Sequence, residues 1–112
     1  MLVSDIVKAL DLTPVVQGVS LEAEVNGGFA SDMLSIVMGE GAPGQVWVTM
    51  QGHHNVVAVA SLIGLSAVIV AGGSAVEPDT IAKAEQNKVV ILTTELPSFT
   101  VIGKLYELGV GK

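Results

Sequence analysis

The sequence predicts an α/β fold: a single compact domain over residues 1–112, with a mostly parallel sheet flanked by helices. Gln45–Met50 and Ala67–Ala71 are apolar runs without a charged residue, as is typical of parallel strands buried on both faces. Segments with helical signals lie between such runs, and a strand–helix–strand order at these lengths favours parallel pairing. A chain of 112 residues, 50% of them hydrophobic, is long enough for one domain with its own core.

The first elements are predicted from capping residues and from alternation. Ser4 is expected to cap a short helix over Asp5–Leu10, and Thr13–Pro14 prevents that helix from continuing. In Leu21–Val25 apolar and acidic residues alternate, which predicts a half-exposed strand that ends at Asn26–Gly28.

A second helix is predicted before the first buried strand. Ser31 or Asp32 is expected to cap it, and it runs to about Met38. Its apolar side is expected to consist of Met33, Leu34, Val37 and Met38. Gly39–Gly44 then forms a turn before the strand Gln45–Met50.

The second half of the chain alternates helices and strands. Asn55–Ile63 is interpreted as a helix despite its valines, because a strand there would leave no crossover between two parallel strands. Ala67–Ala71 is the next strand, and Pro78 suits the first turn of a helix that runs to about Gln86. Val89–Leu92 is a further strand.

The last helix is expected to begin at Ser98, which caps it, and to end at Gly109. Its apolar face is expected to consist of Phe99, Ile102, Leu105 and Tyr106.

Charge and cysteine content exclude several classes of function. A net charge of −6 disfavours nucleic acid and anionic membrane surfaces as partners. The absence of cysteine excludes disulfides, thiolate zinc sites and a cysteine nucleophile. Asp5 stands where an export signal would be basic, so we expect a cytoplasmic protein.

One uncharged stretch, from Gly41 to Val76, is long enough to span a bilayer. No basic cluster flanks it, and it divides naturally into the helix and the strand predicted above. Small or polar residues also interrupt it, namely Gly64, Ser66, Gly72 and Gly73. We therefore expect no membrane association.

No motif in the chain predicts catalysis or a cofactor. Gly39–Gly44 matches G-x-G-x-x-G, but it contains Pro43 and precedes a strand, whereas a dinucleotide loop follows a strand and opens a helix. His53 and His54 are adjacent, so their side chains are expected to diverge, and no third metal ligand lies nearby in sequence. Without a nucleophile elbow either, we expect no enzyme, no catalytic residue and no metal site.

Two loops nevertheless form a candidate ligand site. Gln51–Asn55 and Gly72–Gly73 follow the carboxyl ends of parallel strands, where ligands of open α/β sheets bind, and helix N-termini there favour a nucleotide or another small anion. The candidate ligand-binding residues are Asp32, Thr49, Gln51, His53, Asn55, Gly72 and Gly73. The alternative is purely structural, with Asp32 and Asn55 as helix caps and the glycines as turn residues.

Three stretches of the chain, residues 27–32, 49–60 and 71–73, resemble the DRTGG domain family, most closely its stand-alone, single-domain branch. The family is named after an Asp-Arg pair before one helix and a Thr-Gly-Gly after the next strand. Here the first region reads Gly52–Asn55, and Ala71 takes the place of the threonine before the two glycines.

The resemblance implies a compact α/β fold that often dimerises. Related domains precede some bacterial phosphotransacetylases and lie between CBS domains of certain regulatory pyrophosphatases. The fold is also similar to the N-terminal domain of HPr kinase/phosphorylase, whose kinase chemistry belongs to a P-loop domain that this chain lacks. We therefore expect a non-enzymatic regulatory or ligand-sensing module that forms a homodimer. The alternative is a protein–protein adaptor for a metabolic enzyme, with structural loops.

Overall fold

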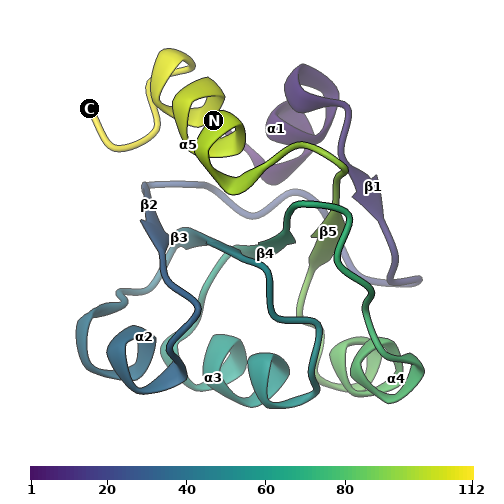
Figure 1. The fold of residues 1–112 in the computed structure, drawn as a ribbon. Helices are drawn as coiled ribbons and strands as arrows, with labels where there is room; N and C mark the ends of the chain where they lie inside the picture. The colour runs from purple at the N-terminus through teal and green to yellow at the C-terminus, as the bar shows by residue number, and fades with distance from the viewer.

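Five strands form the sheet at the middle of the molecule. They are β1 (Thr13–Pro14), β2 (Gly27–Ala30), β3 (Gln45–Thr49), β4 (Ala67–Val70) and β5 (Ile91–Thr93). In the computed structural model, which describes residues 1–112, their order in the sheet is β1-β5-β4-β3-β2 (Figure 1). β2 to β5 are parallel, and β1 alone is antiparallel. The mostly parallel sheet predicted from the sequence is therefore confirmed.

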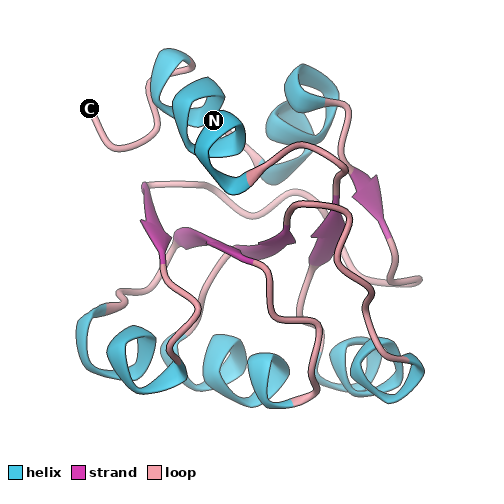
Figure 2. Ribbon diagram, in the orientation of Figure 1, coloured by secondary structure: helices cyan, strands magenta, loops and turns pink.

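Helices cover both faces of this sheet. They are α1 (Val3–Leu10), α2 (Leu34–Glu40), α3 (Asn55–Ile63), α4 (Pro78–Asn87) and α5 (Ser98–Glu107). α1 and α5 lie on one face, and α2, α3 and α4 lie on the other (Figure 2). The sheet is thus the middle layer of three.

The core consists of two apolar clusters, one on each face of the sheet. Along β3 the side chains alternate, so that Val46 and Val48 face α1 and α5 whereas Trp47 faces the opposite helices. All residues of β4 are buried. Burial on both faces explains why these strands lack charged residues.

Most elements of the second half agree with the sequence prediction. α3 occupies Asn55–Ile63 as predicted, and β3 and β4 each end one residue before the predicted boundary. Pro78 lies in the first turn of α4. Gly109, with φ of +105°, directly follows the C-cap of α5. These elements have strong local signals that the tertiary structure does not override.

The predicted start of the first helix is wrong by two residues. The Asp5 carboxylate accepts a hydrogen bond from the Leu2 backbone N–H at 2.8 Å, so α1 begins at Val3. Ser4 lies inside the helix instead of capping it. Asp5 thus stabilises the helix N-terminus from its third position rather than through the residue that precedes it.

The predicted strand at Leu21–Val25 is also wrong. This segment forms only an isolated bridge, between Leu2 and Glu24, because its backbone carbonyls accept hydrogen bonds from the start of α1. The strand begins instead at Gly27, where the sequence predicts an end, and pairs with β3. Pairing with a buried neighbour therefore outweighs the low strand propensity of two glycines.

The predicted apolar side of the second helix is mostly exposed. Val37 is the only buried residue of α2, whereas Met33 and Met38 are 62% and 44% exposed. α2 lies beside the edge strand β2, so little sheet surface is available to cover it.

The last helix also differs from its prediction. α5 buries Val101 and Leu105, but Phe99 is 88% exposed. Pro97 occupies the N-cap position that the sequence assigns to Ser98. α5 therefore buries a narrower face than its apolar residues could cover.

None of the helices has the length and apolar character that crossing a membrane requires. The long uncharged stretch divides, as predicted, into α3 and β4 with a turn at Gly64 between them.

A substitution at Trp47 should measure how much the hydrogen bond from its side chain to the loop after β2 contributes to stability. The buried Trp47 indole N–H donates to the Ser31 carbonyl at 2.8 Å. Trp47→Phe leaves that carbonyl unpaired and should lower the free energy of unfolding by about 1–3 kcal/mol. Urea denaturation followed by circular dichroism tests this. Tyr106→Phe is the control, because its side chain is exposed and should shift stability by less than about 0.5 kcal/mol.

Candidate functional site

The loops after the parallel strands gather at one edge of the sheet, because parallel strands all end on the same side (Figure 1). We call this the carboxyl edge. It consists of residues 31–33 after β2, 50–54 after β3, 71–77 after β4 and 94–97 after β5. Most of the candidate residues lie on these loops.

Asp32 joins the first two loops of the carboxyl edge. Its Oδ1 accepts hydrogen bonds from the Thr49 hydroxyl and from the Met50 backbone N–H, both at 2.7 Å. The Thr49 hydroxyl in turn accepts the Gln51 N–H at 3.1 Å. Asp32 does not cap α2, whose N-cap is Met33, so the expected capping role is wrong. The Asp32 carboxylate and the Thr49 hydroxyl therefore already have hydrogen-bond partners, which connect the loop after β2 to the loop after β3.

Gly72 and Gly73 connect the third loop to the fourth. Their backbone N–H groups donate to the carbonyls of Leu96 at 2.7 Å and Thr94 at 2.9 Å. Both glycines have positive φ, +72° and +70°, a conformation that other residues rarely adopt. Their amides are therefore already paired within the chain, and neither is free to bind an anion.

Gly52 connects the second loop to the start of α4. Its carbonyl accepts the Glu77 N–H at 3.1 Å and the Thr80 hydroxyl at 2.8 Å. A Cβ atom at this position would overlap the carbonyl oxygen of Ala75. The sequence analysis did not predict the hydrogen bond from Thr80 to Gly52. Thr80 lies on an otherwise apolar face of α4, and such a position is a signal for a buried hydrogen bond.

The two histidines behave differently from the sequence expectation. They lie in the turn before α3, and their rings stack with centroids 4.0 Å apart and planes inclined by 36°. The expected divergence assumes a helix or strand, and a turn imposes no such geometry. Asn55 is exposed at the first position of α3, with His54 as N-cap, and its backbone N–H donates to His53 Nδ1 at 3.3 Å.

The two candidate loops do not enclose a common pocket. Gly73 lies at a polar groove of about 280 Å³, which we call the Thr94 groove; its other lining residues are Thr13, Ser74, Thr93, Thr94 and Glu95. His54 and Asn55 line a separate groove of about 490 Å³ between α3 and α4. Gln51 and His53 are not in either groove. The candidate residues therefore do not line one common pocket.

The carboxyl edge is acidic. Asp32, Glu77 and Glu95 are its charged residues, and all three are carboxylates. The whole chain has no arginine and only five lysines. A polyphosphate would meet repulsion here unless a cation accompanied it.

The fold and this edge define a small, mostly parallel α/β domain with polar strand-end loops. The family model of the DRTGG domain matches residues 5–108, so the chain belongs to this family. The resemblance inferred from the three sequence stretches is thereby confirmed. A comparison with curated proteins gave no match.

Among solved structures, the chain is similar to the CBS and DRTGG domains of the regulatory region of Clostridium perfringens pyrophosphatase, complexed with the activator diadenosine tetraphosphate. The TM-score is 0.68 at 17% identity, over 91% of this chain and 44% of the other. The chain thus spans less than half of that regulatory region. At this identity the similarity establishes the fold, and the ligand remains that of the pyrophosphatase.

Gly52→Ala should test the connection between the second loop and α4. The added methyl group must displace the backbone at Ala75, so the free energy of unfolding should fall by about 1–3 kcal/mol. Gly39→Ala is the matched control. Gly39 lies in α2 with no neighbour within 4 Å, so alanine there should stabilise by about 0.5–1 kcal/mol. Equal stabilities of the two variants in urea denaturation would contradict the close packing at Gly52.

Proposed function

We propose that the chain is a regulatory module without catalytic activity, which acts in the cytoplasm and senses a small polar ligand. A nucleotide or another small anion, bound together with a cation that offsets the acidic edge, is the first candidate. The observation that carries the proposal is the Thr94 groove, a hollow at the carboxyl edge whose lining residues include no hydrophobic side chain. Membership of the DRTGG family and the similarity to a pyrophosphatase regulatory region support this function.

Backbone hydrogen bonds hold the walls of the Thr94 groove in place. The Thr94 carbonyl accepts the Gly73 N–H at 2.9 Å, and the Thr94 N–H donates to the Val70 carbonyl at 3.1 Å. Its hydroxyl accepts the Leu96 N–H at 3.1 Å. A groove with fixed walls loses little entropy when a ligand binds, which favours recognition of small molecules.

A thermal-shift screen tests the ligand-sensing role directly. ATP, ADP, AMP, diadenosine tetraphosphate and acetyl phosphate cover nucleotides and acyl phosphates. A compound present at about 100 times its Kd should stabilise the fold by about 2.7 kcal/mol and raise the Tm. Lack of stabilisation by all of them at saturating concentration would count against an anionic ligand.

Glu95→Gln tests whether the ligand binds in the Thr94 groove. Glu95 is exposed and lines this groove, so removing its negative charge should strengthen binding of an anion by about fivefold. Affinity is measured by isothermal titration calorimetry. Glu107→Gln makes the same charge change at an exposed position of α5 and is the control. Equal effects of the two variants would place the ligand elsewhere.

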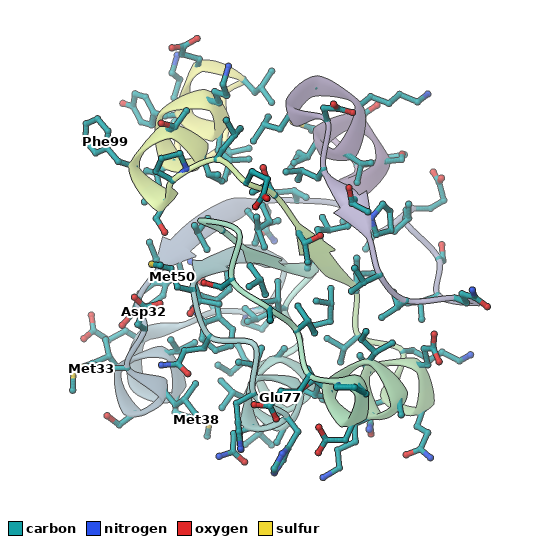
Figure 3. All side chains as sticks on the ribbon, turned by 45° about the vertical axis from the view of Figure 1, so that its right-hand side comes forward. Asp32, Met33, Met38, Met50, Glu77 and Phe99 are labelled. Carbon is teal, nitrogen blue, oxygen red and sulfur yellow. The ribbon has the colours of Figure 1, made fainter.

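A second candidate function, docking of another protein chain, is supported by a strip of exposed apolar residues. We call it the apolar strip; it consists of Met33, Ile36, Met38, Phe99, Ile102 and Tyr106. Its residues come from α5 and from α2 with its N-cap Met33, the two helices that flank the edge strand β2. Figure 3 shows Phe99, Met33 and Met38 along one side of the molecule.

β2 joins the two halves of the apolar strip. A groove of about 180 Å³ lies between β2 and α5, lined mainly by apolar residues that include Phe29, Ile102 and Tyr106. β2 itself has no charged residue and no proline, the usual protection of an exposed strand edge. We propose that a second copy of the chain covers the strip and forms a homodimer. The alternative occupant is a partner enzyme.

Phe99→Ser tests the homodimer. Phe99 is 88% exposed, so its removal should leave the fold intact and shift the chain from dimer to monomer. Light scattering after size-exclusion chromatography measures the mass. Leu62→Ser is the control, because Leu62 is 73% exposed on α3, away from the apolar strip. A monomeric wild-type chain would contradict self-association and favour the partner enzyme.

A further inference from the structure

A cluster of three metal-ligating side chains lies on the carboxyl edge, outside the Thr94 groove. One ring nitrogen of His53, one of His54 and one carboxylate oxygen of Glu77 are all within 4.8 Å of one another. We propose that these three side chains form a binding site for a divalent transition-metal ion such as Zn²⁺ or Ni²⁺. The inference is independent of the regulatory role proposed above.

Backbone contacts bring the two parts of the cluster together. The histidines follow β3, and Glu77 directly precedes α4, more than twenty residues later in the chain. The Glu77 N–H donates to the Gly52 carbonyl at 3.1 Å, next to His53 in the chain. Thr80 donates its hydroxyl to the same carbonyl at 2.8 Å. These hydrogen bonds use no metal-ligating atom, so they hold the site together without competing with an ion.

The ligand types select the class of metal. Two imidazoles and a carboxylate suit Zn²⁺, Ni²⁺ and Cu²⁺, whereas Mg²⁺ and Ca²⁺ prefer oxygen ligands alone. In tetrahedral coordination, ligand atoms about 2.1 Å from one ion are roughly 3.4 Å apart. The most widely separated ligand atoms of the cluster therefore have to approach by up to about 1.4 Å. Glu77 is exposed, and its side chain lies in the helix layer below the sheet (Figure 3), so it is free to make this movement.

When His54 binds the ion through Nε2, Asp79 supplies an outer contact of the kind found behind metal-binding histidines. Its Oδ2 lies 3.2 Å from His54 Nδ1, a nitrogen that is shielded from solvent and makes no well-formed hydrogen bond. A carboxylate behind one ring nitrogen orients the imidazole and leaves the other nitrogen for the metal.

His53 limits the affinity of the site. Its Nδ1 accepts the Asn55 N–H at 3.3 Å, a long hydrogen bond with which an ion on this nitrogen has to compete. The site also has three protein ligands, whereas closed structural zinc sites have four. We therefore expect weaker binding than at a closed four-ligand zinc site, with coordination positions left for water or a ligand.

Calorimetric titration of the tag-free chain with ZnCl₂, NiCl₂ and MgCl₂ tests the site. Zn²⁺ and Ni²⁺ should bind one ion per chain, and Mg²⁺ should give no binding heat. His53→Ala, His54→Ala and Glu77→Gln should each weaken binding by at least about tenfold. Glu107→Gln removes the same charge far from the cluster and should change the affinity by less than about twofold.

Several results would overturn the site. One is the absence of Zn²⁺ and Ni²⁺ binding, and another is equal affinity for Mg²⁺. A third is that Glu77→Gln binds Zn²⁺ as well as Glu107→Gln does. Circular dichroism of each metal-free variant separates lost binding from lost folding. The chain has only two histidines, so paramagnetic broadening by Ni²⁺ in NMR spectra should affect residues around His53 and His54 first. Broadening elsewhere would also overturn the site.

Discussion

Burial of β3 and β4 on both faces is the constraint on which the rest of the structure depends. Because each side chain of β4 is buried, helices have to cover both faces of the sheet. Each helix between two parallel strands returns the chain to the edge where the strands begin, so these strands all end at the opposite edge. Charged residues are thereby excluded from the strands, and the charged and polar residues of the site are concentrated in the loops that follow them. The carboxyl edge is a direct consequence of this arrangement.

The groups at the carboxyl edge serve mainly to connect its loops. The Asp32 carboxylate, the Thr49 hydroxyl and the amides of Gly72 and Gly73 all have partners within the chain. These four residues therefore have a structural role, although Asp32 connects two loops and does not cap α2. Of the other candidate residues, Gln51, His53 and Asn55 keep side chains that are exposed or half-buried, and they lie apart from the Thr94 groove.

Electrostatics distinguishes this domain from a simple phosphate-binding module. Its strand-end loops contain carboxylates and histidines but no lysine, and the chain has no arginine to pair with phosphate. Such an edge attracts cations more readily than anions. The apolar strip shares only Met33 with the carboxyl edge and no residue with the Thr94 groove, so a small ligand in that groove and a protein partner need not compete for the same residues.

The sequence by itself determined the elements whose signals are local. The fold class, α3, the buried strand at Ala67 and the start of α4 at Pro78 follow from apolar runs and backbone preferences. Membership of the family also follows from short stretches of sequence.

Only the tertiary structure decided the features that depend on contacts between distant residues. Gly27 and Gly28 form a strand because β3 lies beside them, and Phe99 is exposed because α5 packs on the sheet through Val101 and Leu105. The place of Glu77 beside His53 depends on a hydrogen bond to Gly52 that no periodicity predicts. The reason is physical: sequence patterns report local backbone preference and burial, whereas a site is made of side chains that the fold brings together.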